Sequence, residues 1–332
     1  MTKQTLAVRP LNGDDAARLS AFFRALSPDA LSLFTPHSIS PEALERICRE
    51  TVDMTHTARL AAVSDDRIVG YGILDELYRP VPILSLGILD AYAGCGIGKM
   101  LLNAMLDWAR SRDYVLACAA VPPRNVRAHR LLQHDGFYQV GNAMNGDMLF
   151  MYNLVPQSAE SLTCWEPVAI SYTARSGKPY MLRSLREDDG AKLDAFFHSM
   201  SPASIAFFTP HRLDRASLDT LCRDTQHDPM DDRFVAVWTV DGEERVIGYV
   251  FLRLLDEVVT SVGIGVADEA QGEGIGRVML TFLKSRARTH GKHVLRLITH
   301  STNYKAQKLY KTCGFEQYGT ATNGELLMFC PL

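Results

Sequence analysis

The chain has 332 residues and a formal net charge of −3, with hydrophobic residues making up 47% of the sequence. This length is sufficient for two ordinary domains, and the scattered basic residues give no electrostatic footprint for nucleic acid. The seven cysteines form no Cys-x-x-Cys pair, which favours free thiols over a disulfide framework or a zinc site. The N-terminal residues lack the apolar core of a signal peptide, and no apolar run approaches membrane-spanning length. We therefore expect a cytoplasmic protein that holds no metal and binds neither membrane nor nucleic acid.

Apolar periodicity predicts the same order of elements in each half of the chain. A strand and a helix are followed by a short helix pair, three strands, a glycine-rich loop with its helix, another strand, a further helix and a closing hairpin. The predicted strands before the hairpins are residues 6–11, 59–63, 68–74, 83–89 and 114–120, and then 181–185, 234–239, 246–254, 258–266 and 294–299. Pro41 and Asp214 mark helix starts, and Asn145-Gly146 and Asn323-Gly324 mark hairpin turns. This order predicts an α+β fold in which each half is a mixed, mostly antiparallel sheet with one βαβ crossover.

The two halves are copies of one another. VRPLNGDDAARLSAFFRALSPDALSLFTPH from Val8 returns as LRSLREDDGAKLDAFFHSMSPASIAFFTPH from Leu182, and the register later shifts by four residues near Asp241. A period of this length indicates a duplicated domain rather than a solenoid. We expect domains at residues 1–155 and 179–332, joined by a linker at residues 156–178 that is rich in Ser, Thr and Pro and whose end begins the second sheet. One hypothesis from the repeat is a pseudo-dimer within the chain; the sequence leaves the oligomeric state open.

The stretch Gln271-Gly272-Glu273-Gly274-Ile275-Gly276 joins an apolar strand to an amphipathic helix. Glycine lets successive amides approach a ligand, and the helix adds unpaired N–H groups, so the loop predicts an anion site of the kind that binds a pyrophosphate. A plain tight turn is the structural alternative. A Rossmann fingerprint would need G-x-G-x-x-G and an acidic residue about twenty positions on, where this chain has basic residues, and the Gly-Lys-Ser/Thr of a P-loop is absent.

This loop resembles the Q/R-x-x-G-x-G/A signature of the GNAT superfamily of N-acetyltransferases. Downstream, Asn303-x-x-Ala306-x-x-Leu309-Tyr310 and Gly314-Phe315 resemble the second signature of that superfamily, and the resemblance covers both halves almost end to end. It implies tandem GNAT domains and transfer of an acetyl group from acetyl-CoA, as co-substrate, to an amine. It also implies that the fourth and fifth strands splay apart, that CoA enters the gap, and that a backbone N–H of the fourth strand polarises the thioester carbonyl. The cofactor contacts that it implies are Ile264, Val266, Gln271, Gly272, Gly274, Ile275, Gly276, Arg277, Asn303 and Tyr310.

Three side chains are candidates for proton transfer. A phenol with a pKa near 10 can protonate a thiolate whose conjugate acid has a pKa near 8.5, so Tyr310 is the candidate general acid. His211 and His300 are candidate bases for the amine. Because Phe-Thr-Pro-His also occurs at the corresponding place in the first half, ending at His37, the favoured interpretation of His211 is a structural brace of a turn.

The halves differ at chemically important positions. In the first half Ala93 replaces Gln271 and Leu132 replaces Tyr310, and leucine cannot donate a proton. We expect catalysis in the second half and a degenerate first half, whose second candidate cofactor site is Gly94, Gly96, Gly98, Lys99 and Asn125. An exposed helix charge is the alternative interpretation of both Lys99 and Arg277.

The acceptor is the least specified part of the prediction. An α-amine with a pKa near 8 needs less help from a base than lysine near 10.4 does, which favours a small-molecule amine. A protein lysine acetyltransferase and a non-catalytic acyl-CoA sensor or assembly module are the alternatives.

Overall fold

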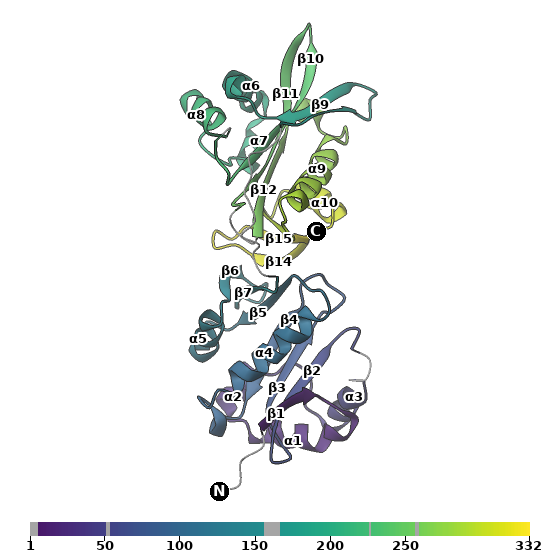
Figure 1. Ribbon diagram of the computed structural model, residues 1–332, viewed down its shortest axis with the longest axis vertical. Coiled ribbons are helices and arrows are strands. Elements are labelled where there is room, and N and C mark those ends of the chain that lie inside the picture. The colour runs from purple at the N-terminus through teal and green to yellow at the C-terminus, as the bar shows by residue number, and fades with distance from the viewer. Residues whose placement is uncertain (1–5, 51–53, 156–166, 226, 256–258) are drawn as a thin grey trace. The chain divides into compact units, whose positions relative to one another are not determined.

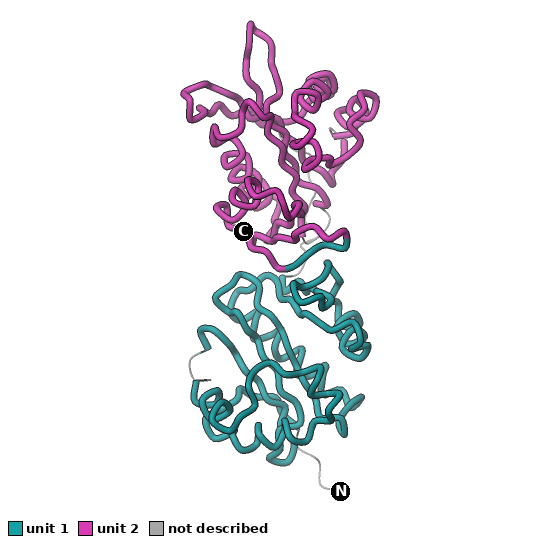
Figure 2. Tube along the Cα trace, turned by 180° about the vertical axis from the view of Figure 1, so that it is seen from behind, with its two compact units in different colours: residues 1–156, 319–322 teal, residues 157–318, 323–332 magenta. Residues whose placement is uncertain are grey.

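The computed structural model describes residues 6–50, 54–155, 167–225, 227–255 and 259–332 (Figure 1). The chain forms two compact units, one of residues 1–156 with 319–322 and one of residues 157–318 with 323–332 (Figure 2). They are called the first and the second unit below, and each is described by itself. None of the helices in the described ranges is long and apolar enough to span a bilayer.

The described residues of the first unit form a sheet and five α-helices. Its strands are β1 (Leu6–Pro10), β2 (Ala58–Ser64), β3 (Arg67–Asp75), β4 (Ile83–Ile88), β5 (Leu116–Val121), β6 (Tyr138–Asn142) and β7 (Met148–Asn153). Its helices are α1 (Ala16–Ala25), α2 (Pro28–Leu33), α3 (Pro41–Glu50), α4 (Ile97–Arg110) and α5 (Val126–His134).

The second unit repeats this order and adds one strand before it. Its strands are β8 (Ala169–Thr173), β9 (Pro179–Ser184), β10 (Asp232–Val240), β11 (Glu243–Arg253), β12 (Val259–Val266), β13 (Val294–Thr299), β14 (Glu316–Thr320) and β15 (Leu326–Pro331). Its helices are α6 (Gly190–Ser199), α7 (Pro202–Phe207), α8 (Arg215–Thr225), α9 (Ile275–Thr289) and α10 (Tyr304–Thr312).

Both sheets have the same topology around one parallel pair. The strand order is β1-β2-β3-β4-β5-β7-β6 in the first unit and β8-β9-β10-β11-β12-β13-β15-β14 in the second. β4 pairs with β5, and β12 with β13, in parallel through the crossover helices α4 and α9, whereas β3–β4, β5–β7, β11–β12 and β13–β15 are antiparallel. The predicted α+β class with one βαβ crossover in each half is confirmed.

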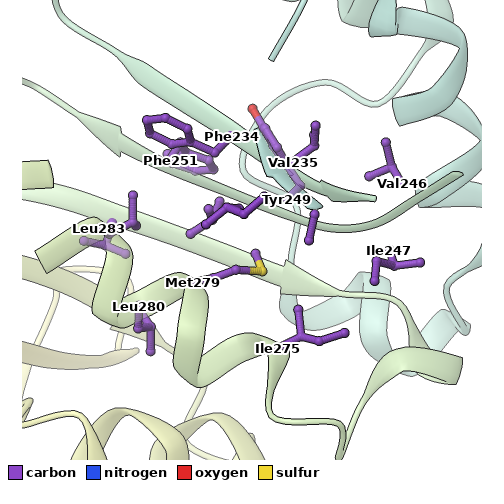
Figure 3. Packing of buried hydrophobic residues seen from close by; sticks show 14 of the residues in the cluster. Phe234, Val235, Val246, Ile247, Tyr249, Phe251, Ile275, Met279, Leu280 and Leu283 are labelled. Carbon is purple, nitrogen blue, oxygen red and sulfur yellow. The ribbon is translucent and has the colours of Figure 1, made fainter. Parts of the chain in front are cut away.

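The hydrophobic core of the second unit lies on both faces of its sheet. In Figure 1, α9 and α10 lie on one side of this sheet and α6, α7 and α8 on the other. Figure 3 shows Met279 of α9 pointing at β11, where a Cβ on Gly248 would come within 2.9 Å of its Sδ. On the opposite face, a Cβ on Gly265 of β12 would meet the ring of Phe208 at 2.4 Å. These glycines let one helix layer and one aromatic layer approach the sheet closely.

An ion-pair network fixes the start of the second unit. Arg183 is 1% exposed and donates to both oxygens of Asp189, at 2.6 and 2.8 Å, and to Glu244. The equivalent pair in the first unit, Arg9 with Asp15, has the same two distances, but the Arg9 side chain is 33% exposed. The repeated sequence therefore gives the same Arg–Asp pair in both units, and the pair is less exposed to solvent in the second unit.

The strand β8 lies inside the stretch 156–178 that the sequence predicts to be a linker. It forms a hairpin with β9, so a domain boundary placed at residue 179 falls within a paired strand region. Residues 156–166 of that stretch lie outside the described residues.

Candidate functional site

A gap between β12 and β13 is the central feature of the second unit. Within the described residues, the two strands pair from Val259 with Val294 to Ser261 with Arg296 and not beyond. Beyond that rung, residues 262–266 pair with β11 on their other side, and residues 297–299 pair with β15. One edge of each strand is therefore available to a ligand, and the predicted contacts Ile264 and Val266 lie on this segment of β12.

The glycine loop follows the open end of β12 and leads into α9. Gly272 and Gly274 have φ of +83° and +85°, and Gly274 is the N-cap of the helix. A side chain at these positions would be strained because an L-residue disfavours positive φ. Gly276 has a different role: a Cβ there would lie 3.1 Å from Leu309 of α10, so its absence lets the two helices pack closely. The N–H groups of a first helical turn suit an anion; in α9 the N–H of Arg277 donates to the Gly274 carbonyl at 3.1 Å.

The side chain of Gln271 braces this loop. Its Nε2 donates to the carbonyl of Val266 at 3.3 Å and to Asp268 at 2.9 Å. Asp268 also accepts the backbone N–H of Ser201, at 2.7 Å, at the start of α7. The loop is therefore tied to the helix on the opposite face of the sheet. Ala93, which replaces Gln271 in the first unit, has no group to make these bonds.

Helix α10 brings Asn303 and Tyr310 to the same side of the sheet as α9. Asn303 is the N-cap, and its Oδ1 accepts the backbone N–H of Ala306 at 3.3 Å, so this oxygen holds the helix. Tyr310 is 8% exposed, with its ring 6.0 Å from that of Phe315. Its hydroxyl forms no side-chain hydrogen bond with any of the described residues, and burial raises its pKa above the ordinary value of 10. The phenol therefore keeps its proton throughout the neutral pH range.

His211 lies in the middle of the segment between α7 and α8, against aromatic rings. Its Nδ1 is 2.9 Å from the carbonyl oxygen of Arg212, which can only accept, so Nδ1 carries the proton and Nε2 holds a lone pair. Burial lowers the pKa of His211, so the ring is neutral at pH 7. Nε2 is sealed from solvent and has no partner in the described part of the chain. In the first unit the matching His37 Nε2 is 3.1 Å from the Tyr71 hydroxyl. A half-buried, ring-packed histidine in both units favours the bracing role.

His300 lies at the exposed end of β13, beside Phe207 of α7 at a ring distance of 5.5 Å. Its Nδ1 accepts the backbone N–H of Thr302 at 3.3 Å, which favours the tautomer with the proton on Nε2. In that tautomer Nε2 is a donor. The geometry therefore offers a substrate a hydrogen-bond donor at His300 more readily than a base.

The remaining predicted positions surround the first-unit loop and the start of α9. Gly94 and Gly96 have φ of +79° and +80°, and Gly96 is the N-cap of α4. Lys99 forms an ion pair with Asp135 at 3.0 Å, so it is engaged within its own unit. Asn125 caps α5 as Asn303 caps α10. In the second unit, Ile275 is buried beneath the loop, whereas Arg277 is exposed beside it.

Two arginines near the second site were not predicted. Arg175, in the turn between β8 and β9, donates to the Gly272 carbonyl at 3.3 Å, and its own N–H donates to Glu273 at 3.0 Å. It lies in the stretch that the sequence assigned to a linker, which concealed it. Arg296 lies at the closed end of the gap. The signal that could have identified it from the sequence is a positively charged residue within the otherwise apolar strand Val294–Thr299.

The sequence places this site in a known class of enzymes, the acyltransferases. The sequence matches the Acetyltransferase (GNAT) family over residues 23–137 and 194–315, well over half of the chain. The protein therefore belongs to this family, with two GNAT domains in tandem.

Known relatives match one domain at a time. An acetyltransferase of Pseudomonas aeruginosa is 28% identical over 143 residues, covering 42% of this chain and 76% of that protein. The GNAT domain of PAT from S. lividans has a TM-score of 0.43 and 21% identity, over 49% of this chain and 97% of that chain. The PaiA N-acetyltransferase of Thermoplasma acidophilum, solved with coenzyme A, has a TM-score of 0.40 and 18% identity, over 45% and 99% respectively.

Proposed function

We propose that the second unit transfers an acetyl group from acetyl-CoA to the primary amine of a small molecule, by direct attack within a ternary complex. The observation that carries this proposal is the gap between β12 and β13, which opens beside the glycine loop and passes between the two faces of the sheet. Acetyl-CoA is the donor known from the family, and the PaiA relative was solved with coenzyme A.

In this proposal the residues of the second unit hold the donor at three places. The loop amides from Gly272 to Gly276 and the start of α9 bind the pyrophosphate. The free edge of β12 receives the pantetheine arm, and a backbone N–H there polarises the thioester carbonyl. No metal takes part in these steps.

Tyr310 donates a proton to the departing thiolate in this scheme. The acceptor nitrogen forms the new C–N bond and loses a proton, while the C–S bond breaks and the sulfur gains one. Because α10 lies on the α9 side of the sheet, the sulfur is protonated on that side and the amine arrives from the side of α6, α7 and α8. The buried site keeps the phenol neutral and ready to donate.

The first unit is proposed to be non-catalytic, since Leu132 stands where Tyr310 does and Ala93 leaves its loop without the glutamine brace. Its proposed degenerate site shares local features with the second unit: Gly94 and Gly96 have positive φ, as Gly272 and Gly274 do, and Asn125 caps α5 as Asn303 caps α10.

An amine panel with acetyl-CoA, run on the full chain and scored by released thiol, tests the proposal. Thiol release should require an amine and yield the N-acetyl product by mass spectrometry. Acetyl-CoA binding without turnover of any amine would contradict catalysis and point to a sensor.

A further inference from the structure

Arg296 is placed at the closed end of the gap. It pairs with Ser261 on the last rung that β12 and β13 share. Its side chain is half-buried, and Nη2 and Nε lie 2.8 and 3.3 Å from the Ser261 hydroxyl oxygen. A ligand entering the gap therefore reaches this guanidinium where the strands close.

The charge of Arg296 is not balanced as the charges of three other interior arginines of the second unit are. Arg183 pairs with Asp189 and Glu244, Arg233 with Asp231, and Arg286 with Asp232. Arg296, in contrast, contacts a neutral hydroxyl, and none of the described carboxylates lies within ion-pair distance of it. A partly desolvated cation without a counter-ion costs free energy, which a bound anion would recover.

The same strand face presents further contacts for a small molecule. Because side chains alternate along a strand, Arg296 and Ile298 share one face of β13, and His300, the first residue after the strand, lies beside Phe207 of α7. Ile298 is 44% exposed, and Phe207 beside His300 is 41% exposed. The register places these side chains on the face of Gly265, where Phe208 packs, opposite the helix that carries Tyr310. This is the side from which the amine approaches in the proposed reaction.

We propose that Arg296 binds an anionic group of the acceptor, so that the substrate is a small amine that also bears a carboxylate or a phosphate. This inference rests on the proposed function. A guanidinium presents its N–H groups as a fork that matches two oxygens of either anion. In the first unit, Cys118 occupies the equivalent place, paired with Ile83, and offers no cation.

Two matched acceptor pairs and three variants test this inference in the full chain. One pair is an amino acid and its carboxamide. The other pair is phosphoethanolamine and ethanolamine. Arg296→Ala should lower kcat/KM for the preferred anionic member about 10- to 100-fold, mainly through KM, since a bond to a charged group is removed. The neutral member should change by less than about 2-fold. Arg296→Lys should retain part of the preference because it keeps the charge and loses the fork.

Arg253→Ala is the matched control. Arg253 shares the sheet face of Ser261, is 44% exposed and has its own partner, Asp231, at 3.6 Å. Arg253→Ala should change kcat/KM for each member of both acceptor pairs by no more than about 2-fold, although it removes the same charge. Thermal melting of each variant reports whether the fold is kept.

The outcomes separate the two proposals. A preference for the carboxylate or for the phosphate, lost in Arg296→Ala, supports the inference and identifies the anion. Turnover without such a preference, or an equal loss for charged and neutral members, overturns the role of Arg296 while leaving acetyl transfer intact. Absence of thiol release with every amine in the wild-type chain overturns both.

Discussion

Tyr310→Phe removes one hydroxyl from the proposed site, and the structure sets the size of both its effects. Because this hydroxyl has no hydrogen-bond partner in the described part of the second unit, its loss should change the free energy of unfolding by less than about 1 kcal/mol. Loss of a positioned general acid should lower kcat about 10²- to 10⁴-fold, which corresponds to about 3–5 kcal/mol in the activation barrier. A catalytic loss without a stability loss is the expected signature.

The assay is thiol release from acetyl-CoA with a saturating amine, with an enzyme-only blank for the exposed thiol of Cys95. Tyr304→Phe is the control, since Tyr304 begins the same helix but is 73% exposed; it should stay within about 2-fold of the wild-type kcat. Because burial raises the pKa of Tyr310, the wild-type kcat should show no alkaline loss from this group up to about pH 9. Retention of more than half of the wild-type kcat by Tyr310→Phe would refute the role of the phenol, as would an equal fall in Tyr304→Phe.

Three further predictions concern the framework of the site. Asn303→Ala should lower the free energy of unfolding by about 1 kcal/mol through the lost helix cap, and it should raise KM for acetyl-CoA. Asn125→Ala should lower the free energy of unfolding equally and leave KM unchanged. An unchanged KM in both variants would mean that the Asn303 cap does not contribute to donor binding. Asp189→Asn should lower the free energy of unfolding by about 3 kcal/mol in urea titrations, because it breaks a fully buried ion pair. Asp15→Asn should lower it by less. An equal loss of unfolding free energy in the two variants would mean that burial of the arginine partner is irrelevant. Burial lowers the pKa of His211, so the stability that its neutral ring confers is present above about pH 6.5 and is lost as the pH falls through the lowered folded-state value; His211→Phe should flatten the fall in unfolding free energy between pH 7 and pH 5, and an identical slope would contradict this.

Much of the fold could be predicted because the chain contains two versions of it. Glycine positions, helix caps and apolar periodicity are local signals, so the crossover, the loop and the hairpins follow from the sequence. The start of α8 after Asp214 is one such case, since the Asp214 carboxylate accepts the Ser217 N–H at 3.1 Å.

The details that sequence reasoning missed depend on contacts between distant segments. The docking of Arg175 on the glycine loop joins residues 97 positions apart, and no local pattern encodes it. The Oδ1 of Asn303 accepts the Ala306 N–H as a helix cap, whereas its contact with the ligand stays a prediction from the family signature. The isolation of Arg296 from carboxylates becomes visible only when the register of β12 and β13 is known.

The incomplete ladder between β12 and β13 also has a consequence for the energetics of the empty protein. Residues 262–266 form an internal sheet edge, so their outward amides should exchange with deuterium faster than those of neighbouring strands. A donor that fills this seam would act as a missing strand and raise the melting temperature in proportion to RT ln(1 + [L]/Kd). In the proposed reaction, the second unit therefore begins each cycle with an incomplete sheet, and the bound co-substrate occupies the open edge.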